Sequence, residues 1–237
     1  MSDSLVIGAG SGIAKAIIDQ LLAVEPNAAV YGVCRNPGFS KHPNLHLMSC
    51  DYSEAEIESV IQQLENGPVI RRVFICNGVL HNSTTMPEKR LEELSGNYFL
   101  DILNSNTLVP LLWLKHLLPL LNHGRTCTVT LFSARVGSIG DNRLGGWYSY
   151  RASKAALNMA VKTAAVEYAR RAKQVKLMLF HPGTTDTPLS TPFQANVPDG
   201  KLFSPQFVAQ QLLSIVDHLE PDGQLSYLDW QGKTIPW

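Results

Sequence analysis

The chain has 237 residues, 45% of them hydrophobic, so it can bury one substantial core. Lys plus Arg and Asp plus Glu number 20 each, and this balance excludes a global field that would recruit nucleic acid or an anionic membrane. Four scattered cysteines without a C-x-x-C pair argue against a zinc knuckle or a disulfide framework and favour a reducing cytoplasm: Cys34, Cys50, Cys76 and Cys127.

Short β-rich runs alternate with longer amphipathic ones, a pattern typical of a parallel sheet covered by helices on both faces. Strands are predicted at residues 4–7, 30–34, 45–49, 73–76, 127–132, 175–180 and 224–227. Helices are predicted between them, at residues 13–23, 54–65, 88–97, 105–120, 150–171 and 205–219. We therefore expect one α/β domain over residues 1–237, with a Rossmann-type doubly wound parallel sheet of about seven strands.

No membrane segment is expected. The first strand begins so early that no signal peptide is predicted ahead of it. The most apolar stretch, residues 108–121, contains two prolines, Lys115 and His116, and is shorter than the roughly 20 residues that a spanning helix needs. We expect it to be a packed helix.

The stretch LVIGAGSGIAKAI, which starts at Leu5, places a strand, a Gly-rich turn and a helix in direct succession. Free N–H groups and the positive dipole end of such a helix bind phosphate, while Gly8 and Gly12 allow the backbone to approach a pyrophosphate closely. Ser11 and Ile13 flank the second of these glycines. We predict that this turn binds a dinucleotide.

The end of the second predicted strand reads YGVCRN and carries Arg35 but no carboxylate. In dinucleotide folds an acidic residue at this point accepts from the ribose 2′-OH, whereas arginine pairs with a 2′-phosphate. NADP(H) is therefore favoured over NAD(H). The alternative is that Arg35 is a solvated loop residue.

Tyr150 and Lys154 stand four residues apart on a predicted helix, so a phenol and an ammonium share one helix face. A nearby ammonium favours the phenolate and would lower the pKa of the tyrosine toward neutrality. The simpler alternative is a helix start with a solvated lysine. Tyr148 has Ala152 at the same spacing, so we expect it to line the pocket or to pack in the loop.

Together, Gly8-x-x-x-Gly12-x-Ala14 and Tyr150-x-x-x-Lys154 resemble the short-chain dehydrogenase/reductase family. Further motifs follow in the family's order: Asp51 in CDYS, Asn77 and Gly78 in CNGVL, Asn106 in NSNTL, and Pro182, Gly183 and Thr187 in HPGTTDT. The segment 134–158, together with PFQANVP and the terminal DWQGKTIPW, is similar to the subgroup that contains the bacterial C-factor protein and sniffer-type carbonyl reductases.

The resemblance implies a reductase fold that transfers a hydride between nicotinamide and a small carbonyl or alcohol substrate. It implies that Tyr150 is the general acid/base and that Lys154 also hydrogen-bonds the nicotinamide ribose. Asn106 would hold a water that links Lys154 to solvent. Asp51 would lie near the adenine, and the P-G-x-x-x-T segment beside the nicotinamide.

One position departs from the family's pattern. The family has a serine pair after the fifth strand, and this chain reads FSARVG there, which puts Ala134 at the expected catalytic serine. Ser133 is our first candidate for polarising the substrate oxygen and Ser138 the second. Successive strand residues face opposite sides of a sheet, so a shift by one residue matters.

The remaining expectations concern the lid, assembly and metals. The irregular region 182–203 is predicted to be a substrate lid, and its Leu189, Phe193 and Phe203 suggest a partly apolar substrate. The apolar helices at 108–121 and from residue 150 favour a homodimer or homotetramer. His81 and His181 have no partner at metal-ligand spacing, so no metal is expected.

Two other functions stay open on the sequence alone. A dinucleotide-binding signalling protein of the C-factor type, with little turnover, would tolerate the missing serine. An epimerase or dehydratase could use the same Tyr and Lys pair with a bound cofactor.

Overall fold

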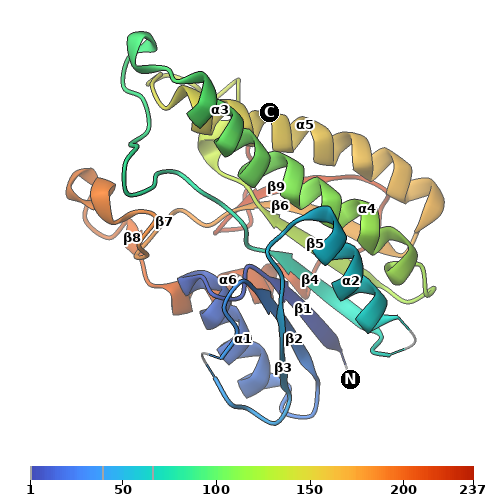
Figure 1. Ribbon diagram of the computed structural model, residues 1–237. Helices are drawn as coiled ribbons and strands as arrows, with labels where there is room; N and C mark the ends of the chain where they lie inside the picture. The colour runs from blue at the N-terminus through green and yellow to red at the C-terminus, as the bar shows by residue number, and fades with distance from the viewer. Residues whose placement is uncertain (1, 39, 66) are drawn as a thin grey trace.

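The computed structural model describes residues 2–38, 40–65 and 67–237 (Figure 1). Among them, seven parallel strands form one sheet in the order β3-β2-β1-β4-β5-β6-β9. Their bounds are Asp3–Ile7 (β1), Val30–Cys34 (β2), Leu45–Ser49 (β3), Ile70–Ile75 (β4), Cys127–Phe132 (β5), Val175–His181 (β6) and Ser226–Asp229 (β9). The predicted α/β fold with a doubly wound parallel sheet is confirmed.

Helices cover both faces of this sheet (Figure 1). Their bounds are Gly12–Val24 (α1), Glu54–Leu64 (α2), Gly96–Leu103 (α3), Val109–Leu121 (α4), Tyr148–Arg171 (α5) and Pro205–Val216 (α6). Residues of α2, α4 and α5 build the core on one face, and residues of α1 and α6 build the core on the other. Alternate residues of β1 supply both cores, since Leu5 and Ile7 belong to the first and Val6 to the second.

The region before α3 differs from the prediction of a helix over residues 88–97. Only a short 3₁₀ turn forms there, Leu91–Glu93 (η1), and α3 starts at Gly96 after Ser95, whose Oγ accepts from Tyr98 N at 3.5 Å. Glu88, at the predicted start, is instead buried against the first turn of α5. The apolar residues whose spacing predicted a helix, Leu91 and Leu94, are exposed, and Glu88 makes a tertiary contact in place of a helical one.

The predicted helix 105–120 belongs to a longer continuous one. A π-helical turn, Asn104–Leu108 (η2), joins α3 to α4, and Asn106 is the buried residue of that turn. Turns of this type are frequent at functional sites because the extra residue redirects side chains.

The predicted lid is less irregular than expected. Thr184–Thr185 (β7) pairs with Leu202–Phe203 (β8), and a 3₁₀ turn, Thr191–Asn196 (η4), lies between them. Within the described part of the chain, no helix is both long and apolar enough to cross a membrane.

Candidate active site

A cleft of about 760 Å³ opens at the carboxyl ends of β1, β2 and β4, where the strand order reverses. Six predicted cofactor residues line it: Gly8, Ser11, Arg35, Asp51, Asn77 and Gly78. Parallel strands bring their carboxyl ends to one edge, so motifs nearly 70 residues apart in the sequence face the same cleft.

The turn after β1 can approach a ligand closely only because it carries glycine. Gly8 has a φ of 81°, and a Cβ there would lie 3.1 Å from the Cys76 carbonyl carbon and 3.3 Å from Asn77 N. Ser11 caps α1 by accepting from Ala14 N at 3.3 Å and lines the cleft itself, which places the N-terminus of α1 beside the cleft. This backbone suits a pyrophosphate.

The lid segment touches the nucleotide turn directly. A Cβ on Gly12 would lie 3.2 Å from Thr187 Cγ2, so the predicted P-G-x-x-x-T segment and the Gly-rich turn form one wall. Gly183 has a φ of 72° and no room for a side chain beside Phe203. Phe203 packs on Trp230 and Phe207, with ring centroids 4.4 and 5.1 Å away, and is not part of the cluster around Tyr150.

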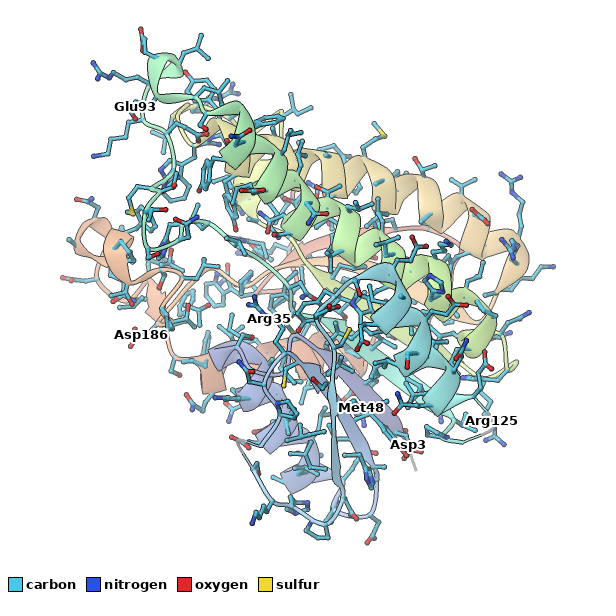
Figure 2. The ribbon with its side chains drawn as sticks, in the orientation of Figure 1. Asp3, Arg35, Met48, Glu93, Arg125 and Asp186 are labelled. Carbon is cyan, nitrogen blue, oxygen red and sulfur yellow. The ribbon has the colours of Figure 1, made fainter. Side chains whose placement is uncertain are left out.

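Two cations lie at the end of the cleft next to β2, where we expect the adenosine of a dinucleotide. Arg35 follows β2 (Figure 2), and Lys15 comes from the first turn of α1. Lys15 is close enough to Cys34 for its charge to lower that thiol's pKa, although burial, the larger effect, raises it. Sequence reasoning missed Lys15; the signal was a basic residue three positions after Gly12, on the turn that faces the end of β2.

Asp51 also lies at this end. Its Oδ1 accepts from Ser53 N at 2.7 Å, and hydrogen bonds from Ser53 lower the pKa of the carboxyl. An ionised, exposed carboxylate here is placed to accept a hydrogen bond from a nucleotide amine or hydroxyl.

The cleft fits a dinucleotide by its donors and by an unpaired acceptor. Asn77 Oδ1 is buried in the cleft wall without a hydrogen-bond partner among the described residues, which marks a polar atom that a ligand would satisfy. Gly78 brings the cleft next to Lys154, since a Cβ built on it would lie 3.7 Å from Lys154 Nζ, an ordinary contact distance.

Tyr150 and Lys154 lie on the first turns of α5, both buried. Lys154 Nζ is 5.9 Å from the centre of the Tyr150 ring and donates to Phe132 O at 2.8 Å. The two side chains therefore share one helix face, as the spacing predicts, and Lys154 also lies next to the floor of the nucleotide cleft at Gly78.

Burial controls the protonation of this pair. It raises the pKa of Tyr150, with a further contribution from Tyr227, and lowers the pKa of Lys154 to about 8. The expected lowering of the tyrosine pKa by the ammonium is thus not seen: burial is the main effect on Tyr150, and Lys154 donates to the Phe132 carbonyl. Tyr150 is a protonated phenol at neutral pH, the form that can donate a proton.

Asn106 holds the loop after β4 against α5. Its Oδ1 accepts from Val79 N at 2.7 Å, and its Nδ2 donates to Val79 O at 2.8 Å and to Ser153 Oγ at 3.0 Å. Both ends of the amide are engaged, so the side chain sets the position of the residues next to Gly78. A water held near Asn106 stays a prediction.

The structure places Ser133 and Ala134 against different partners. Ser133 Oγ donates to Asn158 Oδ1 at 2.6 Å, whereas Ala134, the next residue, is the one that packs with Tyr150 and Leu80. Side chains alternate along an extended segment, so only one of the two can face the Tyr150 side. Ser133 would have to leave Asn158 to reach a substrate there.

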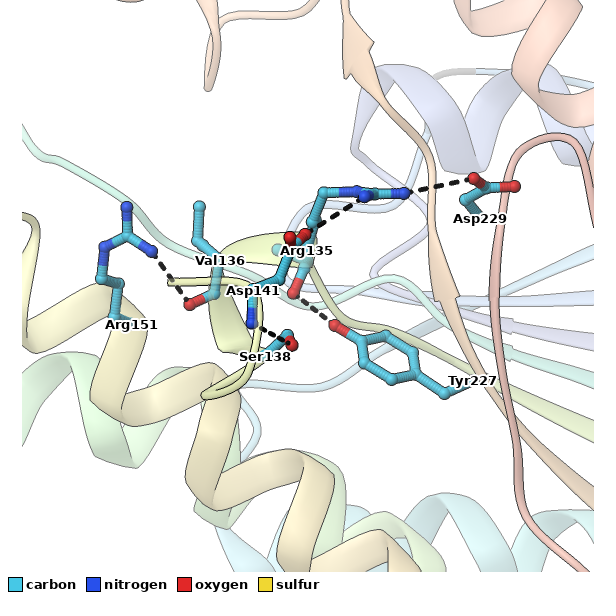
Figure 3. A network of polar contacts seen from close by, with 8 residues as sticks. Arg135, Val136, Ser138, Asp141, Arg151, Tyr227 and Asp229 are labelled. Carbon is cyan, nitrogen blue, oxygen red and sulfur yellow. Dashed lines mark hydrogen bonds and ion pairs between the residues drawn. The ribbon is translucent and has the colours of Figure 1, made fainter. Parts of the chain in front are cut away.

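Ser138, the second candidate, is engaged in the following loop. Its Oγ accepts from Asp141 N at 3.1 Å (Figure 3). Tyr227 donates to Ala134 O at 2.7 Å, and Arg135 bridges Asp141 and Asp229 in the same network (Figure 3). These bonds hold the backbone that presents Ala134.

An aromatic cluster surrounds Tyr150. Trp147 lies 6.2 Å from Tyr150 and 4.8 Å from Phe193 between ring centroids. Leu80 and Ala134 are buried in the same cluster, and Val136 and Leu189 pack against it. Tyr148, which we expected to line the pocket or to pack in the loop, is 37% exposed; its neighbour Trp147 is the one that packs in this cluster.

Glu88 is a second residue that the sequence did not single out. Its carboxylate, 2% exposed, accepts from Ser149 N at 3.2 Å and from Ser149 Oγ, and its backbone oxygen accepts from Trp147 N. α5 has neither an acidic residue in its first turn nor a side-chain N-cap of its own. A distant loop therefore caps the helix that carries Tyr150.

The two histidines that the sequence set apart serve packing. His81 Nε2 lies 3.2 Å from Leu189 O and 3.3 Å from Pro188 O, so it connects the loop after β4 to the lid. Burial, together with the Arg135 charge, lowers the pKa of His181 to about 4. No group of three or more metal-binding side chains occurs in residues 2–38, 40–65 and 67–237.

Known proteins share this arrangement. The family model "short chain dehydrogenase" matches residues 4–198. A Rhodococcus sp. (strain AD45) protein named 1-hydroxy-2-glutathionyl-2-methyl-3-butene dehydrogenase is 30% identical, with both chains covered completely. The C-signal protein of Myxococcus xanthus is 36% identical over 56% of this chain and 74% of its own.

A solved structure agrees at the level of the whole fold. The NADPH-bound carbonyl reductase from chicken fatty liver superposes with a TM-score of 0.82 and 25% identity, covering 100% of this chain and 99% of its own. This chain is therefore an oxidoreductase that belongs to the short-chain dehydrogenase family, whose members bind nicotinamide cofactors.

Proposed function

We propose that the protein is an NADP(H)-dependent oxidoreductase that interconverts a carbonyl compound and its alcohol, with Tyr150 as general acid/base. The observation that carries the proposal is the position of Lys154, which touches the nucleotide cleft at Gly78 and the Tyr150 face at once. One ammonium thus links the cofactor side to the proton donor.

The nicotinamide cofactor, when bound, would supply or accept the hydride. In reduction, Tyr150 Oη would donate its proton to the substrate oxygen as negative charge develops there. Lys154 would stabilise the resulting phenolate and hydrogen-bond the nicotinamide ribose. Asn106 would keep Gly78 and Val79 in place beside them, and a water near Asn106 would return a proton through Lys154.

The nucleotide would be held by backbone and side-chain contacts along the cleft. The residues we propose for it are Gly8, Ser11, Gly12, Ile13, Arg35, Asp51, Asn77, Gly78, Tyr150, Lys154, Pro182, Gly183 and Thr187. Arg35 favours NADP(H) over NAD(H), because a guanidinium pairs with the 2′-phosphate that only NADP carries. Lys15 adds a second cation at the same end.

The polarising donor for the substrate oxygen is the least complete part of the site. Ser133, our first candidate from the sequence, would have to exchange its bond to Asn158 for one to the substrate, so we do not assign it the polarising role. Ser138, the second candidate, is engaged with Asp141.

The test measures the loss of NADPH absorbance with a panel of ketones and aldehydes. We expect turnover by the wild-type protein and a loss of at least about a hundredfold in Tyr150→Phe while NADPH binding is retained, since general acid catalysis contributes roughly 10²–10⁴-fold. Tight NADPH binding without turnover on any member of the panel would contradict the proposal and favour a low-turnover signalling role of the C-factor type.

We further propose self-association as a homodimer or homotetramer. Apolar side chains stay exposed on the layer formed by α3, η2 and α5: Leu100 at 64%, Leu108 at 49%, Met159 at 69% and Val166 at 49%. A layer of this kind is typical of a surface that another subunit covers. Light scattering of Met159→Asp against the wild-type protein tests it, with a smaller mass expected for the variant.

A further inference from the structure

We propose that the substrate carries an aromatic ring next to its carbonyl group, and that this ring binds against Trp147 above Tyr150. The inference rests on the function proposed above, because it takes Tyr150 as the proton donor. It adds the substrate class, which neither the fold nor the Tyr and Lys pair specifies.

The rings around Tyr150 already have the geometry of aromatic recognition. Trp147 meets Tyr150 at 6.2 Å and 74°, and it meets Phe193 at 4.8 Å and 57°. His81 meets Phe193 at 5.9 Å and 67°. These separations and tilts lie in the range that aromatic pairs favour, where the positive edge of one ring faces the negative face of another.

The position of Trp147 is held at a conformational cost. Its φ is 54°, in the left-handed region that bulky residues avoid, and the two residues before it, Gly145 and Gly146, each have a φ of 64°. Hydrogen bonds from Trp147 N to Glu88 O and from Arg151 N to Trp147 O stabilise this backbone. Strain of this kind persists where the surrounding structure enforces it, often at ligand sites.

An aromatic ring, that of Phe193, already fills the space beside Trp147. Phe193 comes from η4, a surface turn with no fully buried residue, and yet its ring packs into the Tyr150 cluster. A substrate ring can take that place against Trp147 while η4 moves outward and Phe193 covers the ring from the lid side. The lid residue thus occupies the subsite that we assign to the aromatic group.

Ala134 adds a reason for an aromatic neighbour. It presents a methyl group in the Tyr150 cluster, and Leu80 stands buried beside it. This wall offers contact area to a flat apolar ring and no hydroxyl to a second polar group. Binding of the ring would therefore orient the substrate carbonyl, a role that a second hydrogen-bond donor could otherwise fill.

The reaction balances without a further reagent. The carbonyl carbon gains a hydride from a reduced nicotinamide, and its C=O π electrons become the lone pair that takes the Tyr150 proton. The aryl ketone becomes an aryl carbinol, and the nicotinamide is oxidised by two electrons.

The test compares ketones of equal size that differ in the ring. Acetophenone and cyclohexyl methyl ketone have the same number of heavy atoms, and benzaldehyde and cyclohexanecarbaldehyde form a second pair. We expect kcat/KM to favour the aromatic member by about tenfold, as two ring contacts would give. Conjugation makes an aryl carbonyl less electrophilic, so intrinsic reactivity works against this result.

Variants assign the preference to the cluster. Trp147→Leu should reduce the aromatic to saturated ratio to near one, and Trp147→Phe should restore most of it. Tyr31→Leu is the matched control, because Tyr31 stacks on His46 at the far side of the sheet and should leave the ratio unchanged. If Trp147→Leu fails to fold, Phe193→Leu gives an independent test. We expect it to reduce the aromatic to saturated ratio of kcat/KM about threefold.

Two outcomes separate the possible failures. Turnover with an equal or reversed ratio in the wild-type protein, or a full ratio in Trp147→Leu, overturns the aromatic assignment and leaves the oxidoreductase function standing. Turnover on other carbonyls of the panel but on none of these four also overturns the aromatic assignment alone, whereas no NADPH oxidation with any member of the panel removes the proposed function together with this inference.

Discussion

The nucleotide cleft and the Tyr150 cluster lie on two sides of Lys154 and are built in opposite ways. The cleft is made from turns after parallel strands, is open to solvent and uses glycine, backbone N–H groups and two cations. The Tyr150 cluster is made from aromatic and aliphatic side chains that come from four separate loops and helices. In our proposal, backbone groups of the cleft bind the cofactor, and side chains of the cluster select the substrate.

The two regions also treat charge differently. Asp51 in the cleft is exposed, and hydrogen bonds from Ser53 lower the pKa of its carboxyl, which favours the ionised form. Tyr150 and Lys154 are buried, and burial moves both toward their neutral forms. Variants on each side should therefore affect different kinetic constants, from a large loss of turnover to a small change in stability.

The largest effect is expected from the residue between the two regions. Lys154→Met removes the ammonium that contacts both, so we expect kcat to fall by about a hundredfold or more and the KM for NADPH to rise. Lys162→Met, two turns further along α5, is the matched control and should keep wild-type kinetics. A variant of Lys154 with normal kcat would show that Tyr150 works without it.

The cleft alone should respond to its cations. Arg35→Ala is expected to weaken NADPH binding by about tenfold to a hundredfold while NADH binding stays unchanged, because a charge-assisted hydrogen bond is worth roughly 1.5–3 kcal/mol. Titration of both cofactors by fluorescence measures the ratio. Lys41→Ala, in the loop after β2, should change neither affinity; an unchanged ratio in Arg35→Ala would contradict our assignment.

The Tyr150 side should respond to the cap of its helix. Glu88→Ala leaves the N-terminus of α5 without its carboxylate, and we expect about a tenfold lower kcat with an unchanged KM for NADPH. Glu88→Gln can still bond Ser149 and should restore most of kcat. Ser204→Ala, which removes the N-cap of α6, controls for stability: it should lower Tm by a similar amount but leave kcat intact.

A smaller gain is expected from a hydroxyl beside Tyr150. Ala134→Ser would place a donor in the Tyr150 cluster, and we expect kcat/KM to rise by about fivefold, as one added hydrogen bond of about 1 kcal/mol gives. Ser133→Ala removes a hydroxyl that now serves Asn158, so less than about a threefold change is expected. A hundredfold loss in Ser133→Ala would instead make Ser133 the polarising residue.

The smallest effect concerns stability and pH in the cofactor-free protein. The folded pKa of Lys154 is lowered to about 8 from 10.5, so the unfolded chain binds more protons between these values and stability rises with pH there. We expect the unfolding free energy of the wild type, minus that of Lys154→Met, to rise by about 1 kcal/mol from pH 8 to 9.5. Urea denaturation at both pH values measures it, and a flat difference would contradict the lowered pKa.

Strands and most helices were predictable because local signals and burial agree there. β2, β3 and β5 have the bounds that the sequence predicts. β5 is buried at every position, as expected for a strand covered on both faces. The prediction of a helix over residues 88–97 was wrong, because the Glu88 carboxylate accepts from the first turn of α5 and not from its own segment. A contact 61 residues away has no signature in a local pattern.

The candidate site divides in the same way. The Gly-rich turn, Arg35, Tyr150 and Lys154 were found from spacing, because their chemistry needs neighbours along the chain or at the end of one strand. Lys15, Trp147 and Glu88 were missed, because each acts on a group from another element. Phe203 was assigned to the substrate side but packs on Trp230.

The sequence by itself determined the doubly wound sheet, the glycine-rich turn after β1 and the helix face shared by Tyr150 and Lys154, since each follows from a local period or motif. Only the tertiary structure decided that Ala134 and not Ser133 faces Tyr150, and that Trp147 and Phe193 enclose it. Side-chain direction after a strand depends on what the neighbouring elements hold, and here Asn158 and Tyr227 hold Ser133 and the Ala134 carbonyl.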